Sequence, residues 1–385
     1  MKWKFYSLAF VAGMSILTAC SSDDNNDNDG NGGNGNGNEI ENGTILKGTI
    51  TSDVTLAAGN TYKLSGEYIV EEGATLHIEE GVKIIAVYDD IADYILVKQG
   101  GKINAVGTPD KPIVMTSEKE EPGAWGGIHI CGRAHTNAEG GKGSSEIGGA
   151  VYGGNDDADN SGTLQYIRLE YTGFAFDEEH EANGISFYGV GNGTIVDHCQ
   201  AYKGSDDGFE FFGGSVNVSN LVAVSCSDDS FDWTEGWNGK GTNLVAYQED
   251  KSTLGYDCDC LMECDNNGSN NAATPVAHPV LKNLILVGNG GSKQGIRLRA
   301  GTEVEIDNAK VCGKGQPLTV ETALTENALK NGTSKLTNIT LTSELSSKEG
   351  IYTHADFIAV TSNKVDANLS YSSFEDIRKE CSWVK

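Results

Sequence analysis

An acidic heptapeptide that occurs twice contains the residues of this sequence best suited to chemistry. Residues 205–211 read SDDGFEF and residues 227–233 read SDDSFDW, 22 residues further along. If the two copies lie on successive turns of a coiled chain, equivalent residues stand about 4.8 Å apart. Carboxylates at that spacing repel each other by roughly 1–3 kcal/mol per pair. Such a stack requires a bound cation, raised carboxyl pKa values or hydrogen bonds from backbone amides.

Three roles for these acids follow from the three kinds of compensation. Ser-Asp-Asp is typical of a turn whose side chains accept backbone N–H groups, which would make the repeat structural. Carboxylate oxygens suit calcium, and a groove lined by acids and aromatic rings suits a sugar. Glycosidases use two carboxyl groups that flank the scissile bond, so catalysis is the third role. The ligand-binding candidates are Asp206, Asp207, Glu210, Asp228, Asp229, Asp232 and Trp237, and the catalytic alternative uses Asp207, Asp228 and Asp229.

The aromatic residues near the second copy divide by their expected exposure. Phe231 and Trp233 alternate with Asp232, so a strand would point both rings into the core and the acid outward. Trp237 stands in the segment Glu-Gly-Trp-Asn-Gly, which predicts a surface turn. Its ring is therefore the candidate for stacking on a sugar.

A second candidate cation site lies upstream of the repeats. Asp157, Asp159 and Ser161 alternate before Gly162, as oxygen ligands do in the first half of a calcium loop. Arg168 occupies the twelfth position, where such a loop has a bidentate glutamate. A solvated turn is the alternative interpretation.

Short strands between tight turns are the elements that must position these residues. The chain contains 50 glycines and only 6 prolines. Over residues 61–84, pairs of apolar residues one position apart are separated by Gly66, Gly73 and Gly81, which predicts strands of period two and intervening turns. The segments NLVAV at 220–224 and NLVAY at 243–247 repeat at nearly the same period as the acidic motif, which is the length of one solenoid turn. The prediction is an all-β protein that forms a parallel β-helix.

The N-terminus has the pattern of an export signal. Lys2 and Lys4 precede an apolar stretch over residues 5–17 that is too short to span a membrane. The segment LTAC at 17–20 resembles the lipobox of bacterial lipoproteins, which implies cleavage before Cys20 and a lipid on its sulfur. We expect a signal peptide over residues 1–19, then the lipidated Cys20 and a disordered Asp/Asn/Gly tether over residues 20–43. An ordinary secretory signal with an incidental cysteine is the alternative.

Charge and cysteine content narrow the function classes. The chain has 28 basic and 55 acidic residues, for a net charge of −27. This balance argues against nucleic acid as a partner and suits a divalent cation such as calcium. Besides Cys20 there are eight cysteines among the nine, and these are expected to pack in the core or to form disulfides. The spacing of Cys258, Cys260 and Cys264 does not match a standard zinc site.

Several longer segments resemble a known family. Residues 125–134 (WGGIHICGRA), 152–159 (YGGNDDAD) and 162–170 (GTLQYIRLE), together with the Ser-Asp-Asp-x-Phe repeat, resemble right-handed parallel β-helix lipoproteins of the Bacteroidetes. The resemblance covers roughly residues 48–288 and implies the same fold. Residues 21–24 (SSDD) resemble the export signal of surface lipoproteins in that phylum, which implies display on the outer face of the outer membrane. Solvation of the tether is the alternative for these acids.

A likeness to pectin-degrading β-helix enzymes is weaker. Asp207 followed one coil later by Asp228 and Asp229 resembles the acids of polygalacturonases, but their Gly-His-Gly motif is missing. Residues 296–299 (IRLR) are only loosely similar to the Arg-x-Lys substrate clamp of those enzymes. Pectate lyases offer another precedent, which implies calcium on carboxylates and an arginine base.

These observations lead to one leading hypothesis and two alternatives. We expect a right-handed parallel β-helix over residues 44–340 and C-terminal coils with a small cap over residues 341–385. The leading hypothesis is a lipid-anchored cell-surface protein that binds an extracellular glycan or matrix ligand along one face, with calcium as a candidate cofactor. The alternatives are a polysaccharide lyase or glycoside hydrolase that uses the stacked aspartates, and a structural adhesin without a small ligand.

Overall fold

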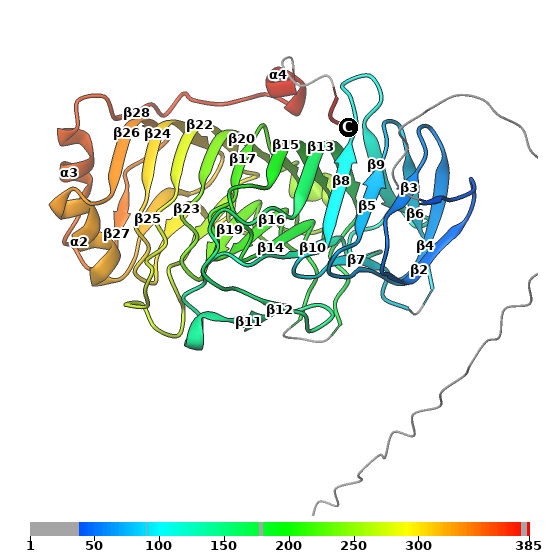
Figure 1. The fold of residues 1–385 in the computed structure, drawn as a ribbon. Coiled ribbons are helices and arrows are strands. Elements are labelled where there is room, and N and C mark those ends of the chain that lie inside the picture. Colours follow the sequence, from blue (N-terminus) through cyan, green and yellow to red (C-terminus); the bar gives the residue numbers. More distant parts are fainter. Residues whose placement is uncertain (1–37, 90, 177–179, 379–382) are drawn as a thin grey trace, which may run out of the picture. The chain divides into compact units, whose positions relative to one another are not determined.

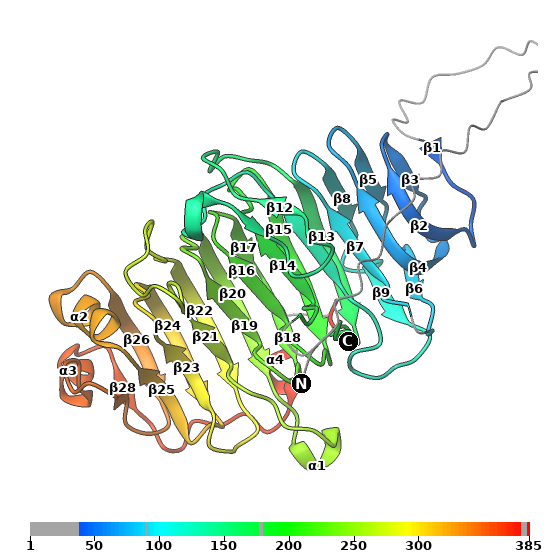
Figure 2. The same ribbon diagram turned by 90° about the horizontal axis from the view of Figure 1, so that it is seen from below.

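Short parallel strands wind the chain into the predicted right-handed β-helix (Figure 1, Figure 2). The computed structural model describes residues 38–89, 91–176, 180–378 and 383–385. The predicted signal peptide, Cys20 and the predicted tether up to residue 37 lie outside the described residues. Within the described residues, one sheet contains 26 strands. Gly66, Gly73 and Gly81 have φ between 72° and 85°. Gly73 and Gly81 lie in turns, as their spacing predicts, whereas Gly66 lies within strand β4 (Thr61–Val70).

Three faces of parallel strands surround the core. The first face consists of β7 (Tyr94–Val97), β10 (Ile128–Cys131), β14 (Ile185–Tyr188), β16 (Phe209–Phe212), β19 (Phe231–Thr234), β21 (Met262–Cys264), β23 (Gln294–Leu298), β25 (Gln316–Val320) and β27 (Ser346–Ser347). The second consists of β1 (Asn38–Glu39), β3 (Val54–Leu56), β5 (Thr75–Ile78), β8 (Lys102–Val106), β17 (Asn217–Ser219) and the first halves of β13 (Gly162–Glu170), β15 (Ile195–Tyr202), β20 (Lys240–Tyr247), β22 (Val280–Val287), β24 (Glu305–Cys312) and β26 (Lys335–Leu341). The third consists of β6 (Lys83–Ala86), β9 (Ile113–Ser117), β18 (Val222–Val224), β28 (Lys364–Val365) and the second halves of those long strands, while β2 (Ile45–Ile50) pairs with the bent strand β4 (Thr61–Val70).

Asparagines hold the corner between the second and third faces. Asn220, Asn243, Asn283 and Asn308 have φ between 53° and 62°, in the left-handed region that asparagine tolerates better than most residues. Each amide nitrogen from Asn243 onward donates a hydrogen bond of 2.9–3.0 Å to the side-chain oxygen of the asparagine one coil earlier. The repeated asparagine therefore fixes both the bend and the stacking of coils.

Stacked apolar side chains fill the interior. The Phe209 and Phe231 rings stack with centroids 5.6 Å apart, and the Phe187 and Phe211 rings with centroids 5.0 Å apart. The seven cysteines of the described residues are all buried and free of disulfides, so the core-packing interpretation of these residues is confirmed. Cys381 lies outside the described residues.

The C-terminal region does more than cap the last coil. Helices α2 (Ala323–Asn331) and α3 (His354–Ala359) lie at the end of the solenoid (Figure 1). The chain then returns along the third face through α4 (Phe374–Arg378), and Lys385 Nζ lies 2.8 Å from Glu170 Oε2 on β13. The β-helix begins earlier than expected, since β1 pairs with β3 before residue 44. Strands β27 and β28 continue the coils after residue 340.

A few elements lie in loops outside the coils. They are the helix α1 (Lys251–Leu254), the 3-10 helix η1 (Glu139–Gly141) and the antiparallel pair β11 (Gly143–Ser144) and β12 (Val151–Tyr152). In the described part of the chain, no helix has the length and apolar character needed to cross a membrane.

The asparagine corner gives a test of the fold. Asn243→Ala should lower the free energy of unfolding by about 2 kcal/mol, because it removes two exposed hydrogen bonds and forces alanine into the left-handed region. Asn243→Gly loses the same hydrogen bonds but keeps the backbone conformation, so its loss should be about 1 kcal/mol smaller. Urea unfolding of both variants measures the difference. A glycine variant no more stable than the alanine variant would contradict this role for the corner.

Candidate functional site

Outward-facing acids on the first face form a ladder across successive coils. Glu210 on β16 pairs in register with Asp232 on β19, which pairs with Glu263 on β21. Arg297 on β23 occupies the next position. The neighbouring Phe209, Phe211, Phe231 and Trp233 point inward and are at most 2% exposed, so the predicted alternation is confirmed.

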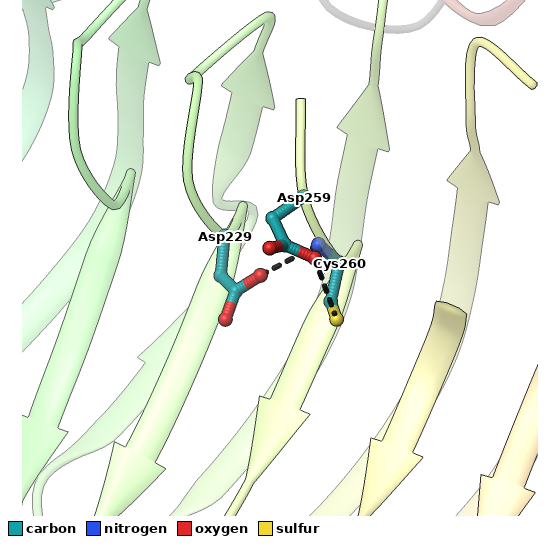
Figure 3. Close-up of side chains that lie close together, drawn as sticks. All are labelled: Asp229, Asp259 and Cys260. Carbon is teal, nitrogen blue, oxygen red and sulfur yellow. Dashed lines mark hydrogen bonds between the residues drawn. The ribbon is translucent and has the colours of Figure 1, made fainter. Parts of the chain in front are cut away.

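A second row of acids stands in the turns that precede these strands. The backbone N–H of Asp229 donates to Asp207 Oδ1 at 2.8 Å, and the backbone N–H of Cys260 donates to Asp229 Oδ1 at 2.6 Å (Figure 3). Asp207 and Asp229 are each 5% exposed. The structural interpretation of the Ser-Asp-Asp turn thus holds for one oxygen of each side chain, although the amide comes from the next coil rather than from the same turn.

The two rows face a common cavity of about 390 Å³ on the first face. Its lining contains ten acidic side chains and one basic side chain, Arg297. All six of the aspartates and glutamates predicted as ligand-binding candidates are among them. The acidic residues are Glu146, Glu181, Asp206, Asp207, Glu210, Asp228, Asp229, Asp232, Asp259 and Glu263.

Burial and mutual repulsion favour the protonated form of these acids. Burial, followed by the charge of Asp228, raises the pKa of Asp206 to about 7. Burial also raises the pKa of Glu146 to about 7. The pKa values of the other deeply placed acids lie well above their usual range, again through burial first and neighbouring carboxylates second. These acids are Asp207, Glu210, Asp229 and Asp232.

The acids come close enough together to share cations. One oxygen each from Asp206, Asp207 and Asp228 lies within 4.8 Å of the others, and the same holds for Asp207, Glu210 and Asp232. Oxygens on opposite sides of a calcium ion are about 4.6–5.2 Å apart, so both groups fit its coordination sphere. Asp232 Oδ1 is buried and has no hydrogen-bond partner in the described part of the chain, which leaves a ligand atom uncommitted.

A third group that contains sulfur is less suited to calcium. Asp229, Asp259 and Cys260 also lie within 4.8 Å of one another (Figure 3). Asp259 forms an ion pair with Lys293, and the Cys260 thiol lies 3.4 Å from Asp259 Oδ1. Calcium prefers oxygen ligands, and here the carboxylates already have partners.

Arg297 belongs to a network of ion pairs. Its guanidinium lies 2.9 Å from Glu263 Oε2 and 3.3 Å from Glu321 Oε2. Although burial lowers the pKa of Arg297, the hydrogen bond with Glu321 and the charge of Glu263 raise it overall. Arg299 is paired in the same way with Glu263 and Asp265, each at 2.7 Å. Neither arginine is placed to give up a proton.

One expectation from the sequence is wrong. Trp237 was predicted at the surface, but it is 1% exposed, and its ring stacks on Phe211 with centroids 4.2 Å apart. The glycine turn before it folds inward, so Trp237 is a core residue and not a platform for a sugar.

In the predicted calcium loop, Asp157 Oδ1 lies 2.6 Å from His135 Nδ1, and Asp159 Oδ2 accepts a hydrogen bond from Ser161 Oγ. The three groups of carboxylate and thiol side chains within 4.8 Å of one another lie elsewhere among the described residues, and a cation at Asp157, Asp159 and Ser161 stays a prediction.

Two residues of the site, Glu146 and Asn183, were not predicted from the sequence. Glu146 comes from the loop between β11 and β12, and Tyr188 donates to its Oε2 at 3.2 Å. Asn183 Nδ2 donates to Glu210 Oε2 at 2.6 Å. These contacts join segments 27 to 42 residues apart, and neither residue belongs to a repeat that would have placed it.

The raised carboxyl pKa values predict that stability falls as the pH rises. The folded chain holds the proton of Asp206 up to about pH 7, and burial keeps the pKa values of Asp207 and Asp229 well above their usual range. Unfolded carboxyl groups lose their protons near pH 4. The free energy of unfolding measured in a chelator should therefore decrease from about pH 6 to about pH 8. Burial lowers the pKa of His129 to about 4, so this residue makes the free energy of unfolding increase with pH over this range. It does so more weakly, because only the unfolded chain titrates there.

Asp206→Asn is the matched control for this pH effect. The variant removes one of the protons involved, so it should flatten the decrease by about 1 kcal/mol over that range. Chemical unfolding at the two pH values gives the comparison. Constant or rising stability in the wild-type chain would show that the carboxylates are already compensated.

Comparison with known proteins agrees with this geometry at the level of family. Searches of the curated proteins and of the solved structures gave no match to this chain. A family model described as a pectate-lyase like beta helix domain matches residues 48–383, which include most strands of all three faces and every acid of the cavity. The chain therefore belongs to the pectate-lyase-like β-helix domain family.

Proposed function

We propose that this protein binds an extracellular glycan through calcium ions held in the acidic cavity, without cleaving it. The observation that carries the proposal is the convergence of Asp206, Asp207, Asp228, Glu210 and Asp232 into two groups whose oxygens lie within 4.8 Å of one another. Asp207 belongs to both groups, which makes it the central ligand. Membership of a pectate-lyase-like family supports a role with polysaccharides.

Calcium fits this site better than a smaller cation. Calcium takes six to eight oxygen ligands at about 2.3–2.6 Å with flexible geometry, whereas magnesium demands a tighter octahedron. Three carboxylates per group leave coordination positions for other oxygens. The hydroxyl or carboxylate oxygens of a sugar can fill them, so the ion would link the protein to its ligand. Binding of the ion would also offset the burial and the mutual repulsion that raise the carboxyl pKa values.

The charged state of the arginines favours binding of the glycan over its cleavage by a lyase, which works by elimination. A lyase needs a base that can lose its proton, and the ion pairs of Arg297 with Glu263 and Glu321 favour its charged form. Hydrolysis remains the second candidate for a specific reason. Asp206 has a pKa of about 7, which suits a general acid beside the ionised partner that a glycosidase requires.

We also propose that the β-helix is displayed at the cell surface by a lipid on Cys20. The export signal and the acidic segment that follows it support this placement, although both lie outside the described residues. Intact-mass measurement of the detergent-extracted protein tests it, because a Cys20→Ser variant should lack the added lipid mass. An unmodified wild-type chain would refute the anchor.

Calcium titration tests the cavity directly. Calcium should bind the full chain and raise its thermal midpoint, because a ligand that binds only the folded state stabilises it. Asp207→Asn should weaken the affinity at least about tenfold, since it removes the ligand that both groups share. Asp250→Asn changes the charge equally at the exposed N-cap of α1 and should leave the affinity unchanged. If titration calorimetry detects no calcium binding, the proposal is refuted.

Glycan binding and cleavage are then separated in one set of experiments. A glycan array probed with the full chain should give signals that depend on calcium and vanish with a chelator or with Asp207→Asn. The bound glycans should release no product on long incubation. Product release by the wild type but not by Asp228→Asn would favour the hydrolase instead. Signals that persist equally in chelator would mean that the cavity is not the binding site.

A further inference from the structure

A second cavity, of about 670 Å³, lies next to the acidic cavity. Strand β19 contributes to both cavities, since Asp232 lines the first and Thr234 lines the second. Both residues point outward from the same strand and are two positions apart, which is about 7 Å. That distance is comparable with the length of one pyranose unit.

Two buried tyrosines in contact hold one acid of each cavity. Tyr188 donates to Glu146 of the acidic cavity, and Tyr152 of β12 donates to Glu235 Oε2 of the second cavity at 2.8 Å. The two rings lie with centroids 5.1 Å apart. The segment from β11 to β12 therefore contributes to both cavities, and one carboxylate in each is held in place.

The second cavity has a rigid wall. Asn267 donates to Asn137 Oδ1 at 3.0 Å, and Asn137 in turn donates to Asn266 Oδ1 at 2.8 Å. Glu235 Oε2 also accepts from Thr136 Oγ1 at 2.7 Å. Its second oxygen, Oε1, takes part in no hydrogen bond with the described residues. A cavity with fixed walls binds without first having to order them.

The chemistry of the lining selects the kind of ligand. The groups that remain available are the hydroxyls of Thr234 and Ser269 and the Nδ2 group of Asn270, together with the carboxylates of Glu139 and Glu235. No lysine, arginine or large apolar side chain lines this cavity within the described residues. An anionic group would meet the negative charge of Glu235, whereas a sugar hydroxyl can donate to it.

We propose that this second cavity is a subsite for a neutral sugar unit of the glycan that the acidic cavity holds through calcium. The inference rests on the proposed function and extends it to a ligand class. The glycan must offer oxygen ligands to calcium on one unit and unmodified hydroxyls on a neighbouring unit. A ligand that is anionic at every unit fits less well than a mixed or neutral one.

Filling the second cavity tests this subsite. Ser269→Trp places a large ring in the cavity and should weaken the binding of long neutral or mixed oligosaccharides about tenfold or more. The affinity for calcium in the absence of glycan and the affinity for disaccharides should both stay unchanged. Ser52→Trp makes the same replacement at an exposed bend of the first coils and serves as the control. Calorimetry with short and long members of a xylan, a glucomannan and a galacturonan series gives the comparison.

The outcomes separate this inference from the proposed function. If the wild type binds calcium and long oligosaccharides but Ser269→Trp binds them equally well, the subsite is refuted. The proposed binding of calcium and glycan in the acidic cavity is then still supported. The same holds if fully anionic chains bind more tightly than the mixed and neutral chains. If the wild type binds no calcium, or binds calcium but none of the oligosaccharides, the proposed function fails, and the subsite fails with it. A Glu235→Gln variant with unchanged glycan affinity would contradict the role given to its free oxygen.

Discussion

Parallel pairing of successive coils places each side chain above its equivalent about 4.8 Å away, and the whole molecule depends on this stacking. Stacked phenylalanines fill the core, and stacked asparagines bond to one another at the corner. The same geometry is costly for acids, because it brings Glu210 next to Asp232 and Asp207 next to Asp229. An arrangement that stabilises apolar and amide side chains therefore destabilises carboxylates unless something else binds them.

Two compensations are visible in the structure, and neither is complete. Backbone amides from the following coil satisfy one oxygen of Asp207 and one of Asp229. Arg297 and Arg299 neutralise Glu263 and Asp265 at one edge of the cavity. The middle of the ladder has neither of these. There Asn183 donates to one oxygen of Glu210, but Asp232 Oδ1 is buried without a partner in the described residues. Retained protons or bound calcium are the remaining ways to stabilise this part of the site, and they compete for the same oxygens.

Features that repeat along the sequence could be predicted from it, and features that depend on folded loops could not. The period of the acidic motif and the alternation of Phe231, Asp232 and Trp233 correctly placed a β-helix and an outward ladder of acids. Trp237 was misplaced because glycine on either side of a residue indicates a turn but not the direction in which the turn folds. Glu146 and Glu235 were missed because long-range contacts through Tyr188 and Tyr152, rather than any local pattern, bring them to the cavities.

The most direct test of the central claim is a crystal structure of the full chain grown with calcium, with the ion located by its anomalous scattering. We expect an ion bound by Asp207, together with Asp206 and Asp228 or with Glu210 and Asp232, at about 2.3–2.6 Å from their oxygens. Calcium found only at other sites, or a cavity that holds only water at saturating calcium, would contradict it.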